Sequence, residues 1–223
     1  MAYNFFSRRN FLKYSSKNLF KAGILSYFLI PLGITPLYAN ILKNKDKLTL
    51  LNDRPINAET PPHLLDDAIT PTSRHFVRNN GIPPDLSDID SNKWLLKING
   101  NVNNPKTYTI KELKSNFEVI TKALLIECGG NGRAFFKPPA SGNQWTYGAV
   151  ACSEWTGVRL ADVLNASNIK SNSIYTGHYS ADIHLSGDSE KDAISRGVPI
   201  SKALDQDNII AFNMNGGDIP LIH

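Results

Sequence analysis

The feature that most constrains this chain is a cysteine in a glycine-rich loop directly after an apolar run. The run Lys122–Glu127 predicts a buried strand, which delivers Cys128 into the loop Gly129-Gly130-Asn131-Gly132-Arg133. Glycines accept positive φ angles without a Cβ clash, so successive backbone N–H groups can converge on an anion. A cation such as Arg133 favours the thiolate form of Cys128, which binds metals or attacks electrophiles. Soft thiolate suits a metal–sulfur centre.

Other interpretations of this loop remain open from the residues alone. A tight glycine turn around a buried thiol would need no chemistry. A cysteine protease could use His178, His184 or His223 as its base, but the residues around Cys128 match no protease signature. A phosphate-binding P-loop is excluded, because no Gly-Lys-Ser/Thr follows the glycines. A disulfide between Cys128 and Cys152 is possible but has no positive support.

Short strands and helices alternate along the rest of the chain, which indicates an α+β fold. Residues 40–90 are polar and rich in proline, and we expect an extended segment with few regular elements. Asn99-Gly100 predicts a two-residue hairpin turn. Strands and helices are expected, in chain order, at Trp94–Ile98, Tyr108–Ile110, Lys111–Leu113 (helix), Leu160–Leu164 (helix), Ser173–Tyr175, the turn after Pro199 (helix) and Asn208–Met214.

The first 39 residues predict an export signal. Ser7-Arg8-Arg9-Asn10-Phe11-Leu12-Lys13 fits the twin-arginine pattern, and an apolar run ends at the cleavage-like Leu37-Tyr38-Ala39. A membrane anchor is the alternative, but Pro31, Gly33 and Pro36 interrupt the run. The twin-arginine route carries folded proteins, so it favours a cofactor inserted before export to the periplasm.

The positive charge of the chain belongs to this leader. The formal net charge is +4, but five basic and no acidic residues lie before residue 40, which leaves 19 basic against 20 acidic residues beyond it. The remaining chain therefore gives no support for nucleic-acid binding.

Several ordered motifs resemble the sulfite oxidase family of molybdopterin enzymes. Glu127–Arg133 looks like that family's molybdenum-ligating cysteine loop, and Phe76-Val77-Arg78-Asn79-Asn80 looks like an earlier cofactor-contacting segment. The resemblance continues through Trp145–Val150, Trp155–Leu160 and Met214–Gly216. Within the family, Phe135–Pro139, Ser141–Trp145 and Gly177–Asp182 are most similar to the molybdenum subunit of bacterial sulfane dehydrogenases.

The resemblance implies roles for individual residues. Cys128 corresponds to the metal ligand, while Arg78 and Arg133 correspond to arginines that attract the substrate and Trp145 to a pocket wall. The positions that correspond to pterin-cofactor contacts are Phe76, Val77, Arg78, Asn79, Asn80, Asp182 and His223. His178 and His184 are expected to be polar loop residues without an assigned role.

The implied activity is oxidation of a sulfur anion, such as sulfite or carrier-bound sulfane sulfur, by oxygen-atom transfer at a molybdenum–molybdopterin cofactor. Electrons would pass to a separate c-type cytochrome, because the sequence has no Cys-x-x-Cys-His haem site. A periplasmic sulfoxide reductase and a non-catalytic remnant are the competing hypotheses. The resemblance divides the chain into a signal peptide (1–39), an extended segment (40–69) and a molybdopterin-binding domain with mixed sheets (70–223).

The family pattern extends beyond the position of His223. It continues with more cofactor contacts, an active-site tyrosine and an immunoglobulin-like dimerisation domain, none of which is in this sequence. We therefore expect a domain that is incomplete at its C-terminus, and an isolated 223-residue product that binds little molybdenum. Near-stoichiometric occupancy in a metal analysis would contradict that expectation.

Overall fold

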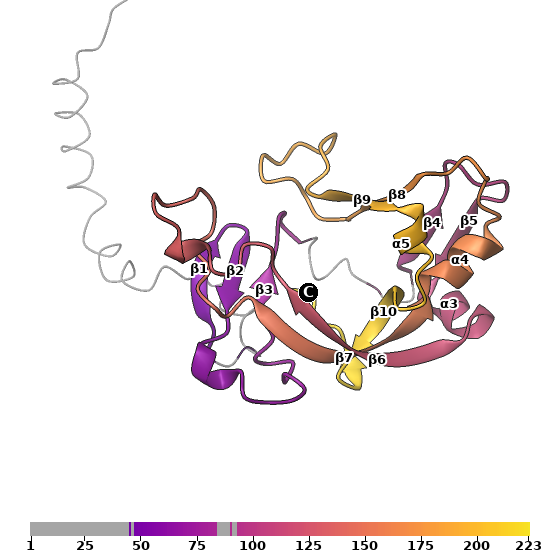
Figure 1. The fold of residues 1–223 in the computed structure, drawn as a ribbon. Coiled ribbons are helices and arrows are strands. Elements are labelled where there is room, and N and C mark those ends of the chain that lie inside the picture. Colours follow the sequence, from indigo (N-terminus) through magenta and orange to yellow (C-terminus); the bar gives the residue numbers. More distant parts are fainter. Residues whose placement is uncertain (1–44, 46, 84–89, 91–92) are drawn as a thin grey trace, which may run out of the picture. The chain divides into compact units, whose positions relative to one another are not determined.

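The computed structural model describes residues 45, 47–83, 90 and 93–223, all of which belong to one compact unit, Asn40–His223 (Figure 1). The predicted export signal lies outside the described residues. In the described part of the chain, no helix combines the length and the apolar character needed to span a membrane. Both cysteines, Cys128 and Cys152, are free thiols.

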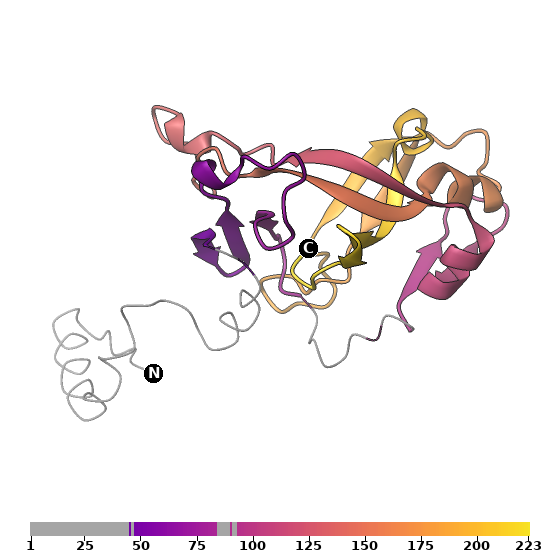
Figure 2. The same cartoon turned by 90° about the horizontal axis from the view of Figure 1, so that it is seen from below.

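A long antiparallel ribbon is the backbone of the unit. Strand β6 (Val119–Glu127) pairs with β7 (Val150–Arg159) along its whole length, from Val119 opposite Val158 to Glu127 opposite Val150 (Figure 2). On its other side β7 pairs with β10 (Ile209–Met214), which turns through Asn215 and Gly216 into β11 (Gly217–Asp218). The sheet order is β11-β10-β7-β6, so β6 is an edge strand.

The predicted strand before Cys128 exists, but its buried character was wrong. Burial along β6 alternates only as far as Leu124, and the last three residues are all exposed, with Leu125 at 69% and Ile126 at 41%. No side chain of β6 is fully buried, because β6 lies at the edge of its sheet and is covered by a neighbouring strand on one side only. The run of apolar residues therefore predicted the strand correctly but did not predict that the strand is exposed to solvent.

The N-terminal part of the unit is more regular than its prolines indicated. Strands β1 (Thr49–Asp53), β2 (Ile56–Glu59) and β3 (Val77–Arg78) form a three-stranded antiparallel sheet, with the 3-10 turn η1 (Pro62–Leu64) between β2 and β3. All four residues of β2 are buried. The prolines lie between these strands, where they limit strand length without preventing pairing.

A hairpin and two helices cover the end of the ribbon opposite the Cys128 loop. Strand β4 (Leu95–Ile98) pairs with β5 (Lys106–Thr109), and helices α3 (Ile110–Asn116) and α4 (Leu160–Ala166) follow β5 and β7. Thr109 and Glu112 form a reciprocal capping box that starts α3. The core here combines side chains of the hairpin, both helices and β7, namely Tyr108, Leu113, Val158 and Val163.

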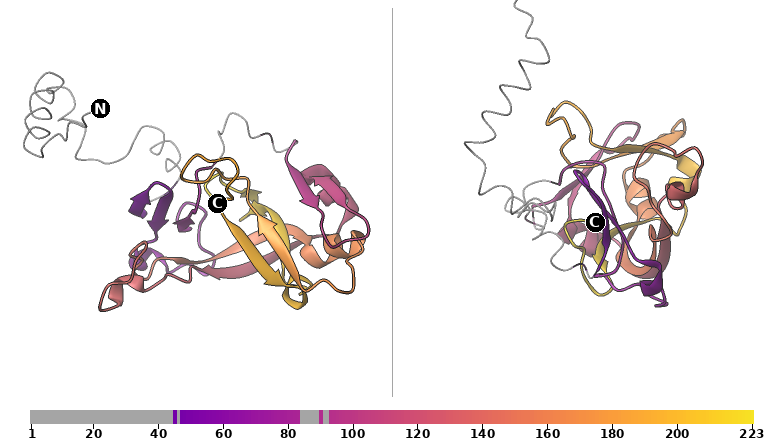
Figure 3. Two further views of the ribbon diagram at one scale, coloured as in Figure 1. Left: turned by 90° about the horizontal axis from the view of Figure 1, so that it is seen from above. Right: turned by 90° about the vertical axis from the view of Figure 1, so that its left-hand side faces the viewer.

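The last small sheet is the β8–β9 ribbon, of Tyr175–Tyr179 and Ser195–Pro199, followed by the short helix α5 (Ile200–Ala203) (Figure 3). Two local predictions need correction. Asn99-Gly100 does not form a two-residue turn, since the connection from β4 to β5 spans residues 99–105. The strand expected at Ser173 begins at Tyr175. Several small sheets with few helices confirm the predicted α+β class.

Gly157 tests the central sheet. A Cβ at this position in β7 would lie 2.2 Å from the carbonyl oxygen of Ile210 in β10. We therefore expect Gly157→Ala to lower the free energy of unfolding by about 1–3 kcal/mol, the usual cost of overpacking. Gly197→Ala is the matched control, because that strand glycine is exposed and its nearest atom would be 3.9 Å away. Equal destabilisation of the two variants in urea melts would contradict the pairing of β7 with β10.

Candidate functional site

Cys128 lies where the β6–β7 ribbon opens into a long loop. Glu127 pairs with Val150, and the N–H of Cys128 donates to the carbonyl of Ala149 at 2.9 Å. The thiol is half-buried, and its Sγ accepts the N–H of Gly130 at 3.4 Å. The ribbon thus fixes the backbone at Cys128 while the loop supplies a donor to its sulfur.

Asn131 braces the mouth of this loop through its side chain. Its amide donates to the carboxylate of Glu127 at 2.9 Å, and its carbonyl oxygen accepts the N–H of Ala149 at 3.1 Å. Its own N–H donates to the carbonyl of Cys128 at 2.8 Å. Gly132 follows with φ of +80°, a conformation that a residue with a side chain rarely adopts. The turn around the thiol is therefore closed on both sides.

The guanidinium of Arg133 lies against the same turn. A Cβ on Gly130 would be 2.8 Å from its Nη2 atom, and a Cβ on Gly142 would be 2.4 Å from its Nη1 atom. Nη1 also donates to the carbonyl of Asn143 at 3.3 Å. The two glycines therefore make room for a cation beside the residue whose N–H contacts the Cys128 sulfur.

Trp145 and Phe76 form the wall behind the thiol. They are 1% and 4% exposed, their rings meet edge to face at 6.2 Å, and Cys128 packs against their cluster with Ala149 and Ala151. The side chain of Trp145 is therefore part of the core as well as the support of the Cys128 loop.

The predicted cofactor segment begins at Phe76 and is held by strand β2. Val77 is fully buried, whereas Arg78 is exposed and its guanidinium donates to the carbonyl of Asn79 at 2.6 Å. Asn79 is anchored to β2, since its N–H donates to the side chain of Asn57 at 2.8 Å and its amide donates to the carbonyl of Ile56 at 3.0 Å. Asn80 is half-buried.

Asp182 joins this segment from a distant part of the sequence. Ile82 and Ile183 exchange both backbone hydrogen bonds, at 2.9 and 2.8 Å, and a Cβ on Gly81 would lie 2.8 Å from the Cβ of Asp182. Burial raises the pKa of the Asp182 carboxyl. The structure therefore brings Asp182 beside the segment that ends at Asn80.

His223 meets the same segment on another side. Its ring lies edge to face with that of His75 at 4.9 Å, and its Nε2 contacts the Nζ of Lys45 at 2.5 Å. His75 stacks on Phe76 at 5.1 Å, and its Nδ1 lies 3.0 Å from the carbonyl of Phe76. Although His223 is exposed as a whole residue, desolvation of its packed ring, and then the charge of Lys45, lower its pKa to about 2.

Three residues of the site were missed by the sequence analysis, namely Glu59, His75 and Lys45. Glu59 is 4% exposed. Its carboxylate accepts hydrogen bonds from the N–H of Thr146 at 2.7 Å and from the hydroxyl of Thr146 at 2.8 Å, and these bonds anchor the loop next to Trp145. His75 precedes the predicted segment directly, so its position was a usable signal. Nothing in the local sequence of Glu59 or Lys45 distinguishes them from surface charges.

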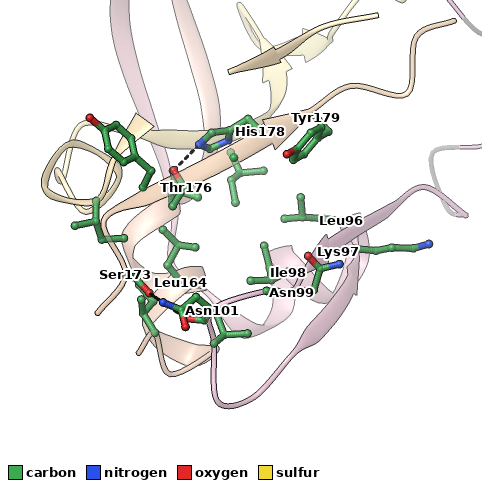
Figure 4. Close-up of a pocket in the computed structure, with 18 of the residues that line it drawn as sticks. Leu96, Lys97, Ile98, Asn99, Asn101, Leu164, Ser173, Thr176, His178 and Tyr179 are labelled. Atoms are coloured by element: carbon green, nitrogen blue, oxygen red, sulfur yellow. Dashed lines mark hydrogen bonds between the residues drawn. The ribbon is translucent and has the colours of Figure 1, made fainter. Parts of the chain in front are cut away.

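A cavity of about 860 Å³ lies near the other end of the ribbon. It is lined by the β4–β5 connection, α4 and β8, and none of the predicted site residues is among the described residues around it (Figure 4). His178 lies at this cavity and its ring contacts the hydroxyl of Thr176 at 2.9 Å. His184 contacts the hydroxyl of Ser186 at 2.8 Å, so both histidines have local partners.

Comparison with known proteins decides the family. Residues 81–223 match the family model described as "Oxidoreductase molybdopterin binding domain". The chain belongs to this family. Its curated relatives include a nitrate reductase of Hordeum vulgare, 34% identical over 124 residues, and the mitochondrial sulfite oxidase of Rattus norvegicus, 27% identical over 198 residues. These alignments cover 54% and 86% of this chain but 14% and 35% of the relatives.

The fold matches a solved relative as well. The sulfane dehydrogenase SoxCD from Paracoccus pantotrophus superposes with a TM-score of 0.62 at 24% identity, over 89% of this chain and 48% of that one. This likeness confirms the predicted sulfite-oxidase-type fold. The chain thus spans about half of the solved relative and a smaller share of the curated ones.

The residues of the site fit the molybdenum–molybdopterin cofactor of this family. A half-buried thiol whose sulfur accepts a backbone N–H offers the soft sulfur atom that a metal–sulfur centre needs. At Gly130 a side chain would collide with the guanidinium of Arg133, so the close approach of Arg133 to the Cys128 loop requires glycine at this position. Among the described residues no group of three or more His, Cys, Asp or Glu side chains is placed to hold a metal ion. Cys128 is the residue of this chain that would bind the cofactor's metal.

Burial of His75 in its neutral form predicts that the folded protein loses stability at acidic pH. Burial, followed in smaller measure by the charge of Lys45, lowers the pKa of His75 to about 4 from 6.5, although the Phe76 carbonyl opposes this. Between these values the unfolded chain takes up a proton that the folded chain does not, so stability is lost as pH falls from 6.5 to 4. The loss attributable to His75 is about 3 kcal/mol.

His75→Asn removes the titrating ring and keeps an amide that can donate to the carbonyl of Phe76. Urea unfolding at several pH values between 7 and 4 should show a shallower loss of stability for this variant than for the parent chain. Parallel pH profiles for the two proteins would show that His75 is not buried in its neutral form.

Proposed function

We propose that this domain is part of an exported enzyme that oxidises a small sulfur anion, either sulfite or sulfane sulfur on a carrier. The observation that carries the proposal is the position of Arg133, whose guanidinium lies on Gly130 in the turn that holds the Cys128 thiol. When bound, the molybdenum cofactor supplies oxygen-atom transfer and accepts the two electrons of the oxidation. The chain supplies the metal ligand, the binding of the anion and its orientation.

The two arginines divide the recognition of the anion between them. Arg133 is held in place by the carbonyl of Asn143 and by two glycines, so little side-chain entropy is lost when an oxyanion binds. Arg78 is exposed at the end of β3 and stays available to a charged group that approaches from solvent. A planar guanidinium can donate two parallel hydrogen bonds to one oxyanion.

The cofactor is held, in this proposal, by the segment Phe76–Asn80 with Asp182 and His223. The side chains of Phe76 and Val77 are buried, so these two residues act through their backbone and through support of the wall. Asp182 offers a carboxyl that can bind N–H groups of a pterin, and His223 offers a ring nitrogen to its phosphate. The coupling of Asp182 to Gly81 through the Ile82–Ile183 bridge favours a shared site.

The remaining features of the proposal come from the sequence and from the resemblance. The twin-arginine motif at residues 7–13 supports export to the periplasm after cofactor insertion. A c-type cytochrome is the proposed electron acceptor, since the sequence has no haem-attachment motif of its own.

Nitrate is the main rival substrate, because the relatives include nitrate reductases. It is also an oxyanion, so the arginines alone do not distinguish it from sulfite. The fold likeness to a sulfane dehydrogenase and the sequence likeness of residues 135–139, 141–145 and 177–182 favour the sulfur substrate. A sulfoxide reductase would run oxygen transfer in the opposite direction and would bind a neutral substrate, with less need of two arginines.

The test uses the complete product of the gene that encodes this chain, matured in a molybdenum-replete host. We expect it to oxidise sulfite with cytochrome c as acceptor, and Arg133→Gln to lower kcat/KM by about 10- to 100-fold, the loss of a charged hydrogen bond. Arg196→Gln is the control, because Arg196 is an exposed arginine of β9 that also donates to a neighbouring carbonyl. Reduction of nitrate or of a sulfoxide without sulfite oxidation would overturn the proposal.

A further inference from the structure

The ammonium group of Lys45 joins three segments that are far apart in the sequence. Its Nζ donates to the carbonyls of Thr72 at 2.6 Å and His75 at 3.2 Å, and it contacts Nε2 of His223 at 2.5 Å. An ammonium has three protons, and these three acceptors use all of them. Lys45 precedes the part of the chain that matches the family model, residues 81–223.

These contacts decide which nitrogen of each histidine ring carries the proton. The Nδ1 of His75 lies 3.0 Å from the carbonyl of Phe76, and a backbone carbonyl only accepts hydrogen bonds, so this Nδ1 carries the proton. The Nε2 of His75 is then unprotonated. An ammonium only donates, so Nε2 of His223 is also a lone pair and its proton is on Nδ1. Burial lowers the pKa of Lys45 to about 8, which keeps the ammonium form at neutral pH.

We infer that Lys45 is a positioning residue, which holds His223 as a neutral Nδ1–H donor and fixes the turn Thr72–His75 that leads into the cofactor segment. The inference rests on the proposed function, because it takes His223 as a contact of the cofactor's phosphate. His75 transmits the effect, since its ring stacks on Phe76, and Phe76 packs in the cluster that contacts Cys128. An outer partner of this kind commonly sets the orientation and tautomer of a ligand histidine.

The direct test is the tautomer of His223 in this chain without cofactor. Long-range ¹H–¹⁵N spectra of histidine-labelled protein at pH 7 distinguish a ring protonated at Nδ1 from one protonated at Nε2, and a His223→Gln spectrum assigns the signals. We expect the Nδ1–H form in the parent chain and its loss in Lys45→Met. Lys47→Met, a change at an exposed lysine two residues away, should leave the spectrum unchanged.

The second measurement is pterin bound per protein in the complete gene product, after equal washing. Lys45→Met should weaken retention of the cofactor about 10-fold, as for other outer partners of ligand histidines, whereas Lys47→Met should not. An Nε2–H or doubly protonated His223 in the parent chain would overturn the inference even if Lys45→Met does not fold. Full retention in His223→Ala would instead refute the cofactor role of His223, with the tautomer result unaffected.

Discussion

The hydrogen bond from the N–H of Cys128 to the carbonyl of Ala149 is the constraint on which the site depends. It closes the β6–β7 ribbon at the residue where the thiol leaves the sheet, so nine paired residues of β6 hold the sulfur against rigid backbone. Asn131 repeats this closure with its side chain, and Gly130 places an N–H on the sulfur. The rest of the loop between β6 and β7 can then change its conformation without moving Cys128.

A buried carboxylate lies next to the apolar wall behind the loop, and its hydrogen bonds are satisfied within the protein. Glu59 is a buried carboxylate whose two oxygens accept the N–H and hydroxyl of Thr146. Breaking one partner of such a pair would leave a buried charge unsatisfied, which is costly in a low-dielectric interior. The N-terminal sheet is therefore a structural part of the site, because β2 provides Glu59 and also anchors Asn79 through Asn57.

Local features of the fold and of the candidate site could be proposed from the sequence because each lies within one contiguous segment. The Cys128 loop, the segment Phe76–Asn80 and the strand Asn208–Met214 each show their character within about ten residues. The contributions of Lys45 and Glu59 could not be predicted, since their partners lie 178 and 87 residues away in the sequence. A charged side chain is also usually expected to be exposed to solvent. The exposure of Leu125 was missed for a related reason, because strand order, which makes β6 an edge, is not a local property.

X-ray absorption at the molybdenum edge tests the role of Cys128 most directly. In the complete gene product matured with molybdenum, the parent protein should show one more Mo–S contact than Cys128→Ser, because the protein thiolate adds to the sulfurs that the cofactor brings. Cys152→Ser, which removes the other free thiol, should leave the spectrum unchanged. An identical sulfur shell in the parent and Cys128→Ser proteins would contradict the assignment of Cys128 as the metal ligand.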